Sequence, residues 1–266
     1  MTAETSAEFS RFIRSPFGMV ICAGPTGSGK TTTLYAVLNQ IASADRNVTT
    51  IEDPVEYVFP LINQVQINEQ ADITFAGGLK AILRQDPDVI LVGEIRDVET
   101  ARIATQAALT GHFVVSSLHA TDATSALHRF MDMGIEPFLI ASSLLGVVGQ
   151  RLIRRNCEHC TELYAPTPEE RAFYERGGGT LEGRDFVAGV GCNFCGQTGY
   201  YDRIGIYEVL RVTDEMKELI VTDAPHAELR ALAIEQGMTT LRDQAIRLVS
   251  EGKTTIAEVL RTVYVL

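Results

Sequence analysis

The fold is decided by the stretch Met19-Val20-Ile21-Cys22-Ala23-Gly24-Pro25-Thr26-Gly27-Ser28-Gly29-Lys30-Thr31. Its first part is a short apolar run, and its second part matches the pattern G-x-x-x-x-G-K-[ST]. Beyond it, apolar residues recur with helical spacing up to Ile41. The glycine pattern therefore lies between a predicted strand and a predicted helix, which is the context in which such loops bind phosphate.

Each residue type in this loop has a physical task. Backbone N–H groups of the loop converge on phosphate oxygens, and the dipole of the following helix adds positive potential. Lys30 is expected to reach the terminal phosphates and Thr31 to ligate Mg²⁺. A glycine turn that binds nothing would leave this Lys-Thr pair unexplained. We therefore predict an ATP site formed by Gly24, Pro25, Thr26, Gly27, Ser28, Gly29, Lys30, Thr31 and Thr32.

Apolar runs further along the chain repeat the alternation of strand and helix. Strands are predicted at Val48–Ile51, Val89–Val92 and Phe113–Leu118, with helices at Phe75–Arg84 and Val98–Leu109. Such alternation is typical of an α/β fold with a parallel sheet and helices on both of its faces.

The remaining segments predict the domain organisation. Residues 1–16 are polar and lack a clear period, which indicates a leader or an arm lying over the core. A helical region over Ala123–Leu145 is followed at Arg151 by a change in composition. We therefore expect a nucleotide-binding core over residues 1–150, a tetracysteine zinc-binding module over 151–207, and a C-terminal helical region over 208–266.

The two later segments differ in their patterns. Residues 156–207 are rich in Gly, Cys and turn residues and lack long periodic stretches, so we expect bound metal to replace the missing core. The C-terminal region carries helical patterns at Asp214–Val221, Ala227–Gln236, Thr240–Glu251 and Ile256–Val263.

Composition bounds the class of protein. The 266 residues are 45% hydrophobic and 21% charged, which is ordinary for a folded globular chain. The net charge of −11 argues against a surface built to neutralise nucleic-acid phosphates, so we do not expect nucleic acid as a partner. The longest apolar stretch, residues 138–149, is too short for a transmembrane segment, and no secretory signal opens the chain. We expect a cytoplasmic protein.

Acidic residues follow two of the predicted strands. Glu94 comes after Gly93, which occupies the position where P-loop proteins usually present an aspartate to Mg²⁺. Glu94 is a candidate to orient or deprotonate the attacking water, or else a solvated residue at a strand end. Glu52 and Asp53 are candidates to reach Mg²⁺ or water beside the same site, or else belong to an ordinary Asp-Pro turn.

His119 directly follows the predicted strand at Phe113–Leu118. Because the carboxyl ends of parallel strands meet at one edge of the sheet, an imidazole there could sense the γ-phosphate. Taken alone, a hydrogen-bonded structural histidine is an equally good interpretation.

Four of the five cysteines form two CxxC pairs, Cys157/Cys160 and Cys192/Cys195. Two such pairs predict a tetrahedral Zn²⁺ site, which is structural because four protein ligands leave no position open to substrate. A redox pair or unligated thiols are the alternatives, although neither pair has thioredoxin-like surroundings. His159 would be a replacement ligand, but the four-thiolate set is complete without it.

Together these elements resemble the family of ATPases that drive type II secretion and type IV pilus assembly. The resemblance runs from about Phe17 to the C-terminus and has four signatures. These are the phosphate loop, an aspartate box at residues 50–57, an atypical second acidic motif at residues 84–97, and a histidine box ending His119-Ala120-Thr121-Asp122-Ala123. In the last, the family more often has Thr-Asn at positions 120 and 121.

The resemblance implies a RecA-like P-loop NTPase that hydrolyses ATP with Mg²⁺. It implies that Glu94 is the catalytic base, that Glu52 assists Mg²⁺ or water, and that His119 contacts or senses the terminal phosphate. It also implies a homo-hexamer in the full-length context, an inner-membrane platform protein as partner, and a location peripheral to the inner membrane. The tetracysteine module favours assembly or secretion over pilus retraction.

Family members carry N-terminal domains that contribute arginines to the nucleotide site, whereas this chain begins almost at the phosphate loop. We therefore expect a fragment that binds ATP but turns it over slowly, because such arginines stabilise developing phosphate charge. Two other functions remain open from the sequence. One is a nucleic-acid-stimulated ring translocase with a basic patch at Arg151, Arg154 and Arg155, and the other is a nucleotide-gated assembly module without turnover.

Overall fold

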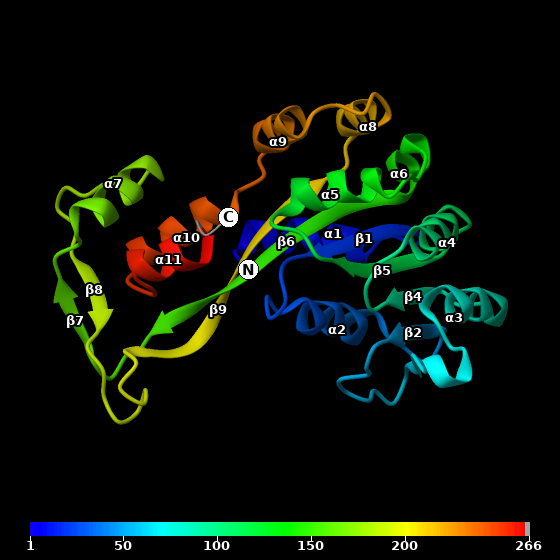
Figure 1. Ribbon diagram of the computed structural model, residues 1–266, viewed down its shortest axis with the longest axis horizontal. Coiled ribbons are helices and arrows are strands. Elements are labelled where there is room, and N and C mark those ends of the chain that lie inside the picture. Colours follow the sequence, from blue (N-terminus) through cyan, green and yellow to red (C-terminus); the bar gives the residue numbers. More distant parts are fainter. Residues whose placement is uncertain (264–266) are drawn as a thin grey trace. The chain divides into compact units, whose positions relative to one another are not determined.

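The computed structural model describes residues 1–263 of the chain (Figure 1). Within these residues one sheet has seven strands: β1 (Gly18–Ala23), β2 (Val48–Glu52), β3 (Asn63–Gln66), β4 (Val89–Val92), β5 (Phe113–Leu118), β6 (Leu144–Asn156) and β9 (Tyr200–Arg211). Their order is β3-β2-β4-β5-β1-β6-β9. A separate two-stranded sheet pairs β7 (Thr161–Tyr164) with β8 (Phe186–Gly189) in antiparallel orientation.

The strands that carry the candidate site are parallel, as the sequence predicts. Strand β1 pairs with β5 and β6, and β2 pairs with β3 and β4, all in parallel register. Every residue of β1, β2, β4 and β5 is buried. Because successive side chains of a strand point to opposite faces, both faces of this part of the sheet are covered.

The helices are α1 (Ala3–Ile13), α2 (Lys30–Ile41), α3 (Phe75–Ile82), α4 (Val98–Leu109), α5 (Ala123–Asp132), α6 (Pro137–Ser143), α7 (Pro168–Arg176), α8 (Asp214–Val221), α9 (His226–Glu235), α10 (Leu241–Ser250) and α11 (Ile256–Val263). Short 3₁₀ turns lie at Glu69–Ala71 and Leu83–Gln85. No helix among residues 1–263 is long and apolar enough to cross a membrane.

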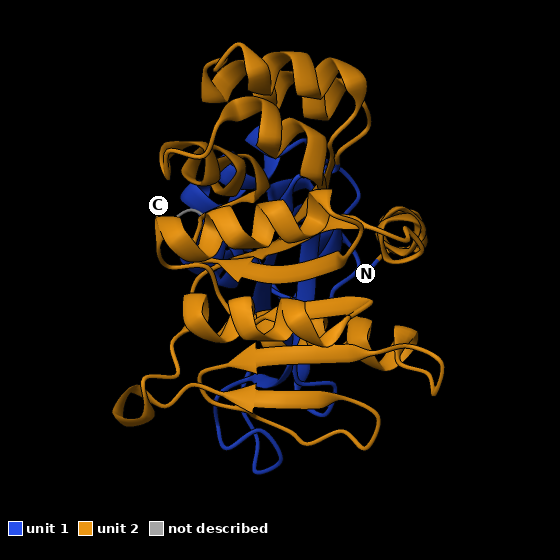
Figure 2. Ribbon diagram, turned by 90° about the vertical axis from the view of Figure 1, so that its right-hand side faces the viewer, with its two compact units in different colours: residues 1, 150–208, 239–266 blue, residues 2–149, 209–238 orange. Residues whose placement is uncertain are grey.

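The chain divides into two compact units, coloured separately in Figure 2. One comprises residues 2–149 and 209–238, and here it is named the sheet unit. Its main core contains alternate residues of β1, namely Met19, Ile21 and Ala23, packed with apolar side chains of helices α3–α6, α8 and α9. Helix α2 lies against β1 and β5 with Leu34 and Leu38 buried.

The other unit comprises Met1 and residues 150–208 and 239–266, and here it is named the cysteine unit. It has a hydrophobic core of its own, in which Phe173 and Tyr174 of α7 pack with Ile246 of α10 and Val259 of α11. The expectation that metal replaces a missing core was therefore wrong, because the C-terminal helices complete that core. The division into three domains at residues 150 and 207 stays a prediction.

Two segments depart from the sequence-based expectation. Residues 1–16 contain helix α1, whose Thr2 side chain caps it by accepting a hydrogen bond from Thr5 N at 3.1 Å. The buried ring of Phe12 lies against Gly146, where a Cβ atom would approach Phe12 Cε2 to 2.4 Å. The supposed helical region up to Leu145 instead changes to strand β6 at Leu144.

Candidate functional site

The phosphate loop joins β1 to α2, as predicted. Gly27 and Gly29 adopt positive φ angles of 75° and 88°, a conformation that costs glycine little. The Lys30 ammonium lies within the loop and donates to Gly24 O at 2.8 Å and to Pro25 O at 3.0 Å. The first N–H groups of α2 have no acceptor inside their own helix, so the loop and helix together form an anion-binding end.

The predicted ATP-binding residues divide by exposure. Ser28 is buried, Lys30 is half-buried, and Thr26, Thr31 and Thr32 are exposed. The hydroxyl of Thr31, at the first turn of α2, is thus accessible for the Mg²⁺ contact that the motif predicts.

Glu52, the last residue of β2, is a buried carboxylate held by several donors. Tyr35 on α2 donates its hydroxyl to Glu52 Oε2. Thr50 Oγ1 donates to Glu52 Oε1 at 2.6 Å, and Gln64 Nε2 donates to the same oxygen at 3.2 Å. Since buried carboxylates are costly without such partners, this set of donors fixes Glu52 in place.

Glu94 follows β4 and pairs with Arg96, which donates to Glu94 Oε1. Arg96 also approaches Asp53, with 3.5 Å between Nη1 and Oδ2, so one guanidinium bridges the ends of β4 and β2. The hydrogen bond from Arg96 lowers the pKa of Glu94, partial burial opposes this, and the charges of Lys30 and His119 lower it further. Glu94 is therefore held as a carboxylate next to the phosphate loop.

Gly93 stands where other P-loop proteins carry an acidic residue, and the structure gives a steric reason. A Cβ atom at this position would lie 3.3 Å from Glu52 Cα and 3.3 Å from Ile51 O. Gly93 N donates to Ile51 O at 2.8 Å, and Ser117 Oγ donates to Gly93 O at 2.8 Å. The absent side chain lets the ends of β2 and β4 approach closely, which places Glu52 beside the second acidic segment.

His119 leaves the end of β5 and contacts the phosphate loop directly. Its Nε2 atom lies 2.9 Å from Thr26 Oγ1, and its carbonyl accepts a hydrogen bond from Arg129 at 3.0 Å. The loop, Glu52, Glu94 and His119 thus stand at the ends of four neighbouring parallel strands, on one edge of the sheet unit. The sequence predicted that these residues lie close together, and the structure confirms it. Their chemical roles stay predictions.

Three contributors to this site were not singled out from the sequence. No sequence pattern pointed to Tyr35 or Gln64, because each contacts Glu52 from a different element of the fold. The contact of Arg96 could have been found from the sequence. Residues i and i+2 of an extended segment point to the same side, and Arg96 follows Glu94 at that spacing.

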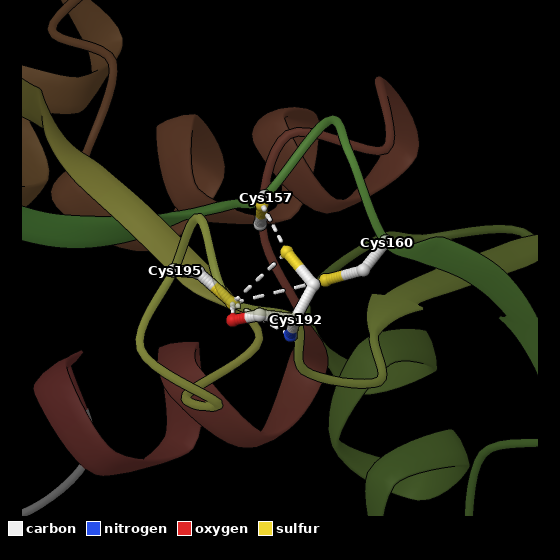
Figure 3. Close-up of side chains that lie close together, drawn as sticks. All are labelled: Cys157, Cys160, Cys192 and Cys195. Carbon is white, nitrogen blue, oxygen red and sulfur yellow. Dashed lines mark hydrogen bonds between the residues drawn. The ribbon is translucent and has the colours of Figure 1, made fainter.

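The four CxxC cysteines converge in the cysteine unit (Figure 3). The sulfur atoms of Cys157 and Cys192 lie 3.9 Å apart, those of Cys160 and Cys195 lie 3.9 Å apart, and those of Cys192 and Cys195 lie 3.7 Å apart. A tetrahedral Zn²⁺ with Zn–S bonds of about 2.3 Å places its sulfurs about 3.8 Å apart. The thiols are unpaired by disulfides, so their geometry fits a four-thiolate zinc site.

The second cysteine pair is also supported by main-chain donors. The backbone N–H groups of Cys192 and Gly199 each donate to Cys195 Sγ at 3.3 Å. Such donors stabilise thiolate charge and orient metal ligands. His159 instead lies against the ring of Phe194, with 4.1 Å between ring centroids.

Comparison with known proteins gives a consistent result. A family model described as "Type II/IV secretion system protein" matches residues 1–261. The type IV pilus assembly ATPase PilB of Thermus thermophilus is 48% identical over 252 residues, covering 95% of this chain and 28% of that protein. The type II secretion system ATPase E of Vibrio cholerae is 47% identical over 265 residues, covering 98% of this chain and 51% of that protein.

Among solved structures, the pilus retraction motor PilT with bound ADP superimposes with a TM-score of 0.69 at 27% identity. The match covers 96% of this chain and 63% of that one. The chain thus spans about half or less of the length of the two curated relatives, from Thermus thermophilus and Vibrio cholerae.

Proposed function

The chain belongs to the type II/IV secretion system protein family, and we propose that it is the ATP-hydrolysing part of a hexameric motor for type IV pilus assembly or type II secretion. One observation carries the proposal. A phosphate loop, two carboxylates and a histidine, taken from four neighbouring parallel strands, face one edge of the sheet unit. The names of the relatives, a pilus assembly ATPase and a secretion system ATPase, support the proposed motor role.

In this proposal the loop binds the triphosphate of ATP through its main-chain N–H groups. The Lys30 ammonium exchanges the carbonyls of Gly24 and Pro25 for phosphate oxygens, which are stronger acceptors because they are charged. Thr31 and the carboxylate region at Glu52 supply oxygen donors suited to Mg²⁺, which neutralises charge on the phosphates when bound.

Glu94 is assigned as the general base that takes a proton from the attacking water. For this it must be ionised, which its lowered pKa ensures, and it must exchange Arg96 for water. His119 is assigned as a sensor, because its contact with Thr26 couples the imidazole to the loop that surrounds the phosphates. Loss of the γ-phosphate changes these contacts, and such a difference between nucleotide states can drive domain motion.

The zinc site is proposed to be structural, held by Cys157, Cys160, Cys192 and Cys195. We propose that the protein acts in the cytoplasm and reaches the inner membrane through a platform protein; the names of its relatives, as pilus assembly and secretion ATPases, support this proposal.

The alternative of a nucleic-acid translocase depends on a basic patch at three arginines. Arg151 is buried, Arg154 pairs with Glu258, and Arg155 pairs with Glu158. One of the three guanidinium groups is buried and the other two are each paired with a carboxylate, which favours the motor over the translocase.

The rate of ATP hydrolysis, compared between the parent and a variant, distinguishes a motor from a module that binds ATP without turnover. Single-turnover hydrolysis of labelled ATP, with protein in excess, resolves even slow rates. Glu94→Gln is expected to bind Mg-ATP with little change and to hydrolyse it on the order of 10² to 10⁴ times more slowly, because a general base is lost. A parent chain that binds ATP but hydrolyses it no faster than Glu94→Gln would show that turnover is absent.

A further inference from the structure

Tyr35 lies at the junction between the phosphate-binding helix and the acidic end of β2. It is buried on α2, five positions after Lys30, with 6% of its surface exposed. Its hydroxyl donates to Glu52 Oε2 and accepts a hydrogen bond from Glu56 N at 3.1 Å. The single hydroxyl therefore has both a donor and an acceptor contact, one to the last residue of β2 and one to the loop that follows it.

The other oxygen of Glu52 is held from the opposite direction along the sheet. Gln64 on β3 donates to Glu52 Oε1 and also donates to Tyr57 O at 2.9 Å. Its own oxygen accepts from Phe59 N at 2.8 Å. Strand β3 and the loop after β2 are thus already joined through Gln64, whereas Tyr35 is the contact that links Glu52 to the helix of the phosphate loop.

The protonation state of Tyr35 suits a fixed donor. Burial and the hydrogen bond to Glu52 raise the pKa of Tyr35, so the phenol keeps its proton throughout the neutral range. Its ring also lies edge-on to Phe59, with centroids 5.2 Å apart, and so cannot rotate freely. A donor that is fixed in both charge and position defines the orientation of its acceptor.

We propose that Tyr35 is a positioning residue for ATP hydrolysis, which fixes the Glu52 carboxylate relative to the phosphates bound at the start of α2. The inference rests on the proposed function, because it assigns Tyr35 a role only through Glu52. Tyr35 does not touch the nucleotide in this account. Its loss therefore changes the orientation of a catalytic group and leaves ATP binding in place.

The test compares Tyr35→Phe, which removes only the hydroxyl, with Tyr174→Phe as a matched control. Tyr174 is a fully buried tyrosine of the cysteine unit whose hydroxyl lies 2.6 Å from Ser250 Oγ. Single-turnover hydrolysis by the whole chain is expected to slow about tenfold in Tyr35→Phe, the loss typical of one hydrogen bond to a charged group. The protein concentration giving half-maximal single-turnover rate is expected to stay within about twofold, and Tyr174→Phe is expected to hydrolyse ATP at the parent rate.

A double-mutant cycle with Glu52→Gln separates positioning from general structural damage. If Tyr35 acts through Glu52, Tyr35→Phe causes no further slowing in the Glu52→Gln background. An equal slowing in both backgrounds, or none in the parent, would overturn the inference while leaving the proposed function intact. Absence of hydrolysis by the parent chain, or a Glu52→Gln variant as fast as the parent, would instead contradict the functional assignment and the inference with it.

Discussion

At the scale of single residues, the Arg96 guanidinium controls the acidity of Glu94. Its hydrogen bond is the largest cause of the lowered pKa of Glu94, and Arg96 is partly exposed, so a nucleotide or water can displace it. Without nucleotide, the proposed base Glu94 is therefore paired with Arg96, which belongs to the same acidic motif.

Replacing Arg96 by Gln is predicted to raise the pKa of Glu94 towards its ordinary value. Because only ionised Glu94 accepts a proton, hydrolysis by Arg96→Gln should be lost at a higher pH than in the parent as the solution is acidified. The rate kcat/KM measured against pH checks this shift. Arg102→Gln is the control, because it removes one positive charge from an exposed position on α4. An acidic limb that is the same in the parent and in Arg96→Gln would contradict the assignment of Glu94 as base.

The sequence predicted the main side chains of the site but not their supporting contacts. Glu52, Glu94 and His119 were found because each ends or follows an apolar run, and parallel strands end at one edge. Tyr35 and Gln64 escaped because contacts between different elements leave no local pattern. Gly93 was recognised as a substitution, whereas its steric reason required the distance to Glu52.

At the scale of elements, the predicted strands and helices of the sheet unit agree with the structure wherever a turn separates one element from the next. The error at β6 arose within the continuous apolar stretch of residues 138–149, which contains the end of α6 and the start of β6. Periodicity cannot distinguish a buried helix from a buried strand in such a run. Helix α1 was missed because its large apolar residues, Phe9, Phe12 and Ile13, are confined to its last turn and a half.

The zinc site makes a prediction at this scale. Purified, reduced protein is expected to contain about one equivalent of zinc, as a tetrahedral four-thiolate site requires. Cys192→Ser should lose most of this zinc and melt at a lower temperature, because metal binding to such a site contributes folding free energy. Cys22→Ala, which changes the buried cysteine of β1, should keep its zinc. Elemental analysis that finds less than about half an equivalent in the parent would count against the site.

A second element-scale feature is the buried carboxylate of Glu258, which joins β6 to α11 in the cysteine unit. Arg154 donates to Glu258 Oε2 at 2.7 Å, and Arg261 donates to Oε1 at 2.7 Å. Burial by itself raises the pKa of Glu258, but the hydrogen bonds from Arg261 and Arg154 outweigh it and lower the pKa to about 2.

The lowered pKa of Glu258 predicts acid sensitivity. The stabilisation is fully present above the unfolded value of 4.5 and is lost as the pH falls towards about 2. At neutral pH, Glu258→Gln is expected to lower the free energy of unfolding by about 1–3 kcal/mol, because both arginines lose a charged acceptor. Urea unfolding followed by circular dichroism should show this difference shrinking below pH 4.5. A difference independent of pH, or one equal to that of the exposed control Glu175→Gln, would contradict the account.

At the scale of the whole molecule, each unit has its own core and its own candidate site. The nucleotide residues lie in the sheet unit, and the four cysteines lie in the cysteine unit. The chain passes between the units near Gly149 and Glu208, within strands β6 and β9, and again near Met238. The motor proposal requires that nucleotide state at the first site alter the arrangement of domains in a ring, so nucleotide binding is its first requirement.

Titration calorimetry of the folded chain with Mg-ATP tests that requirement most directly. The parent is expected to give saturable heat at one site per chain, and Lys30→Ala to lose most of it, because the ammonium group no longer reaches the phosphates. Circular dichroism establishes that both proteins are folded. Equal binding by the parent and Lys30→Ala, or no binding of Mg-ATP by the parent up to millimolar concentrations, would contradict the account.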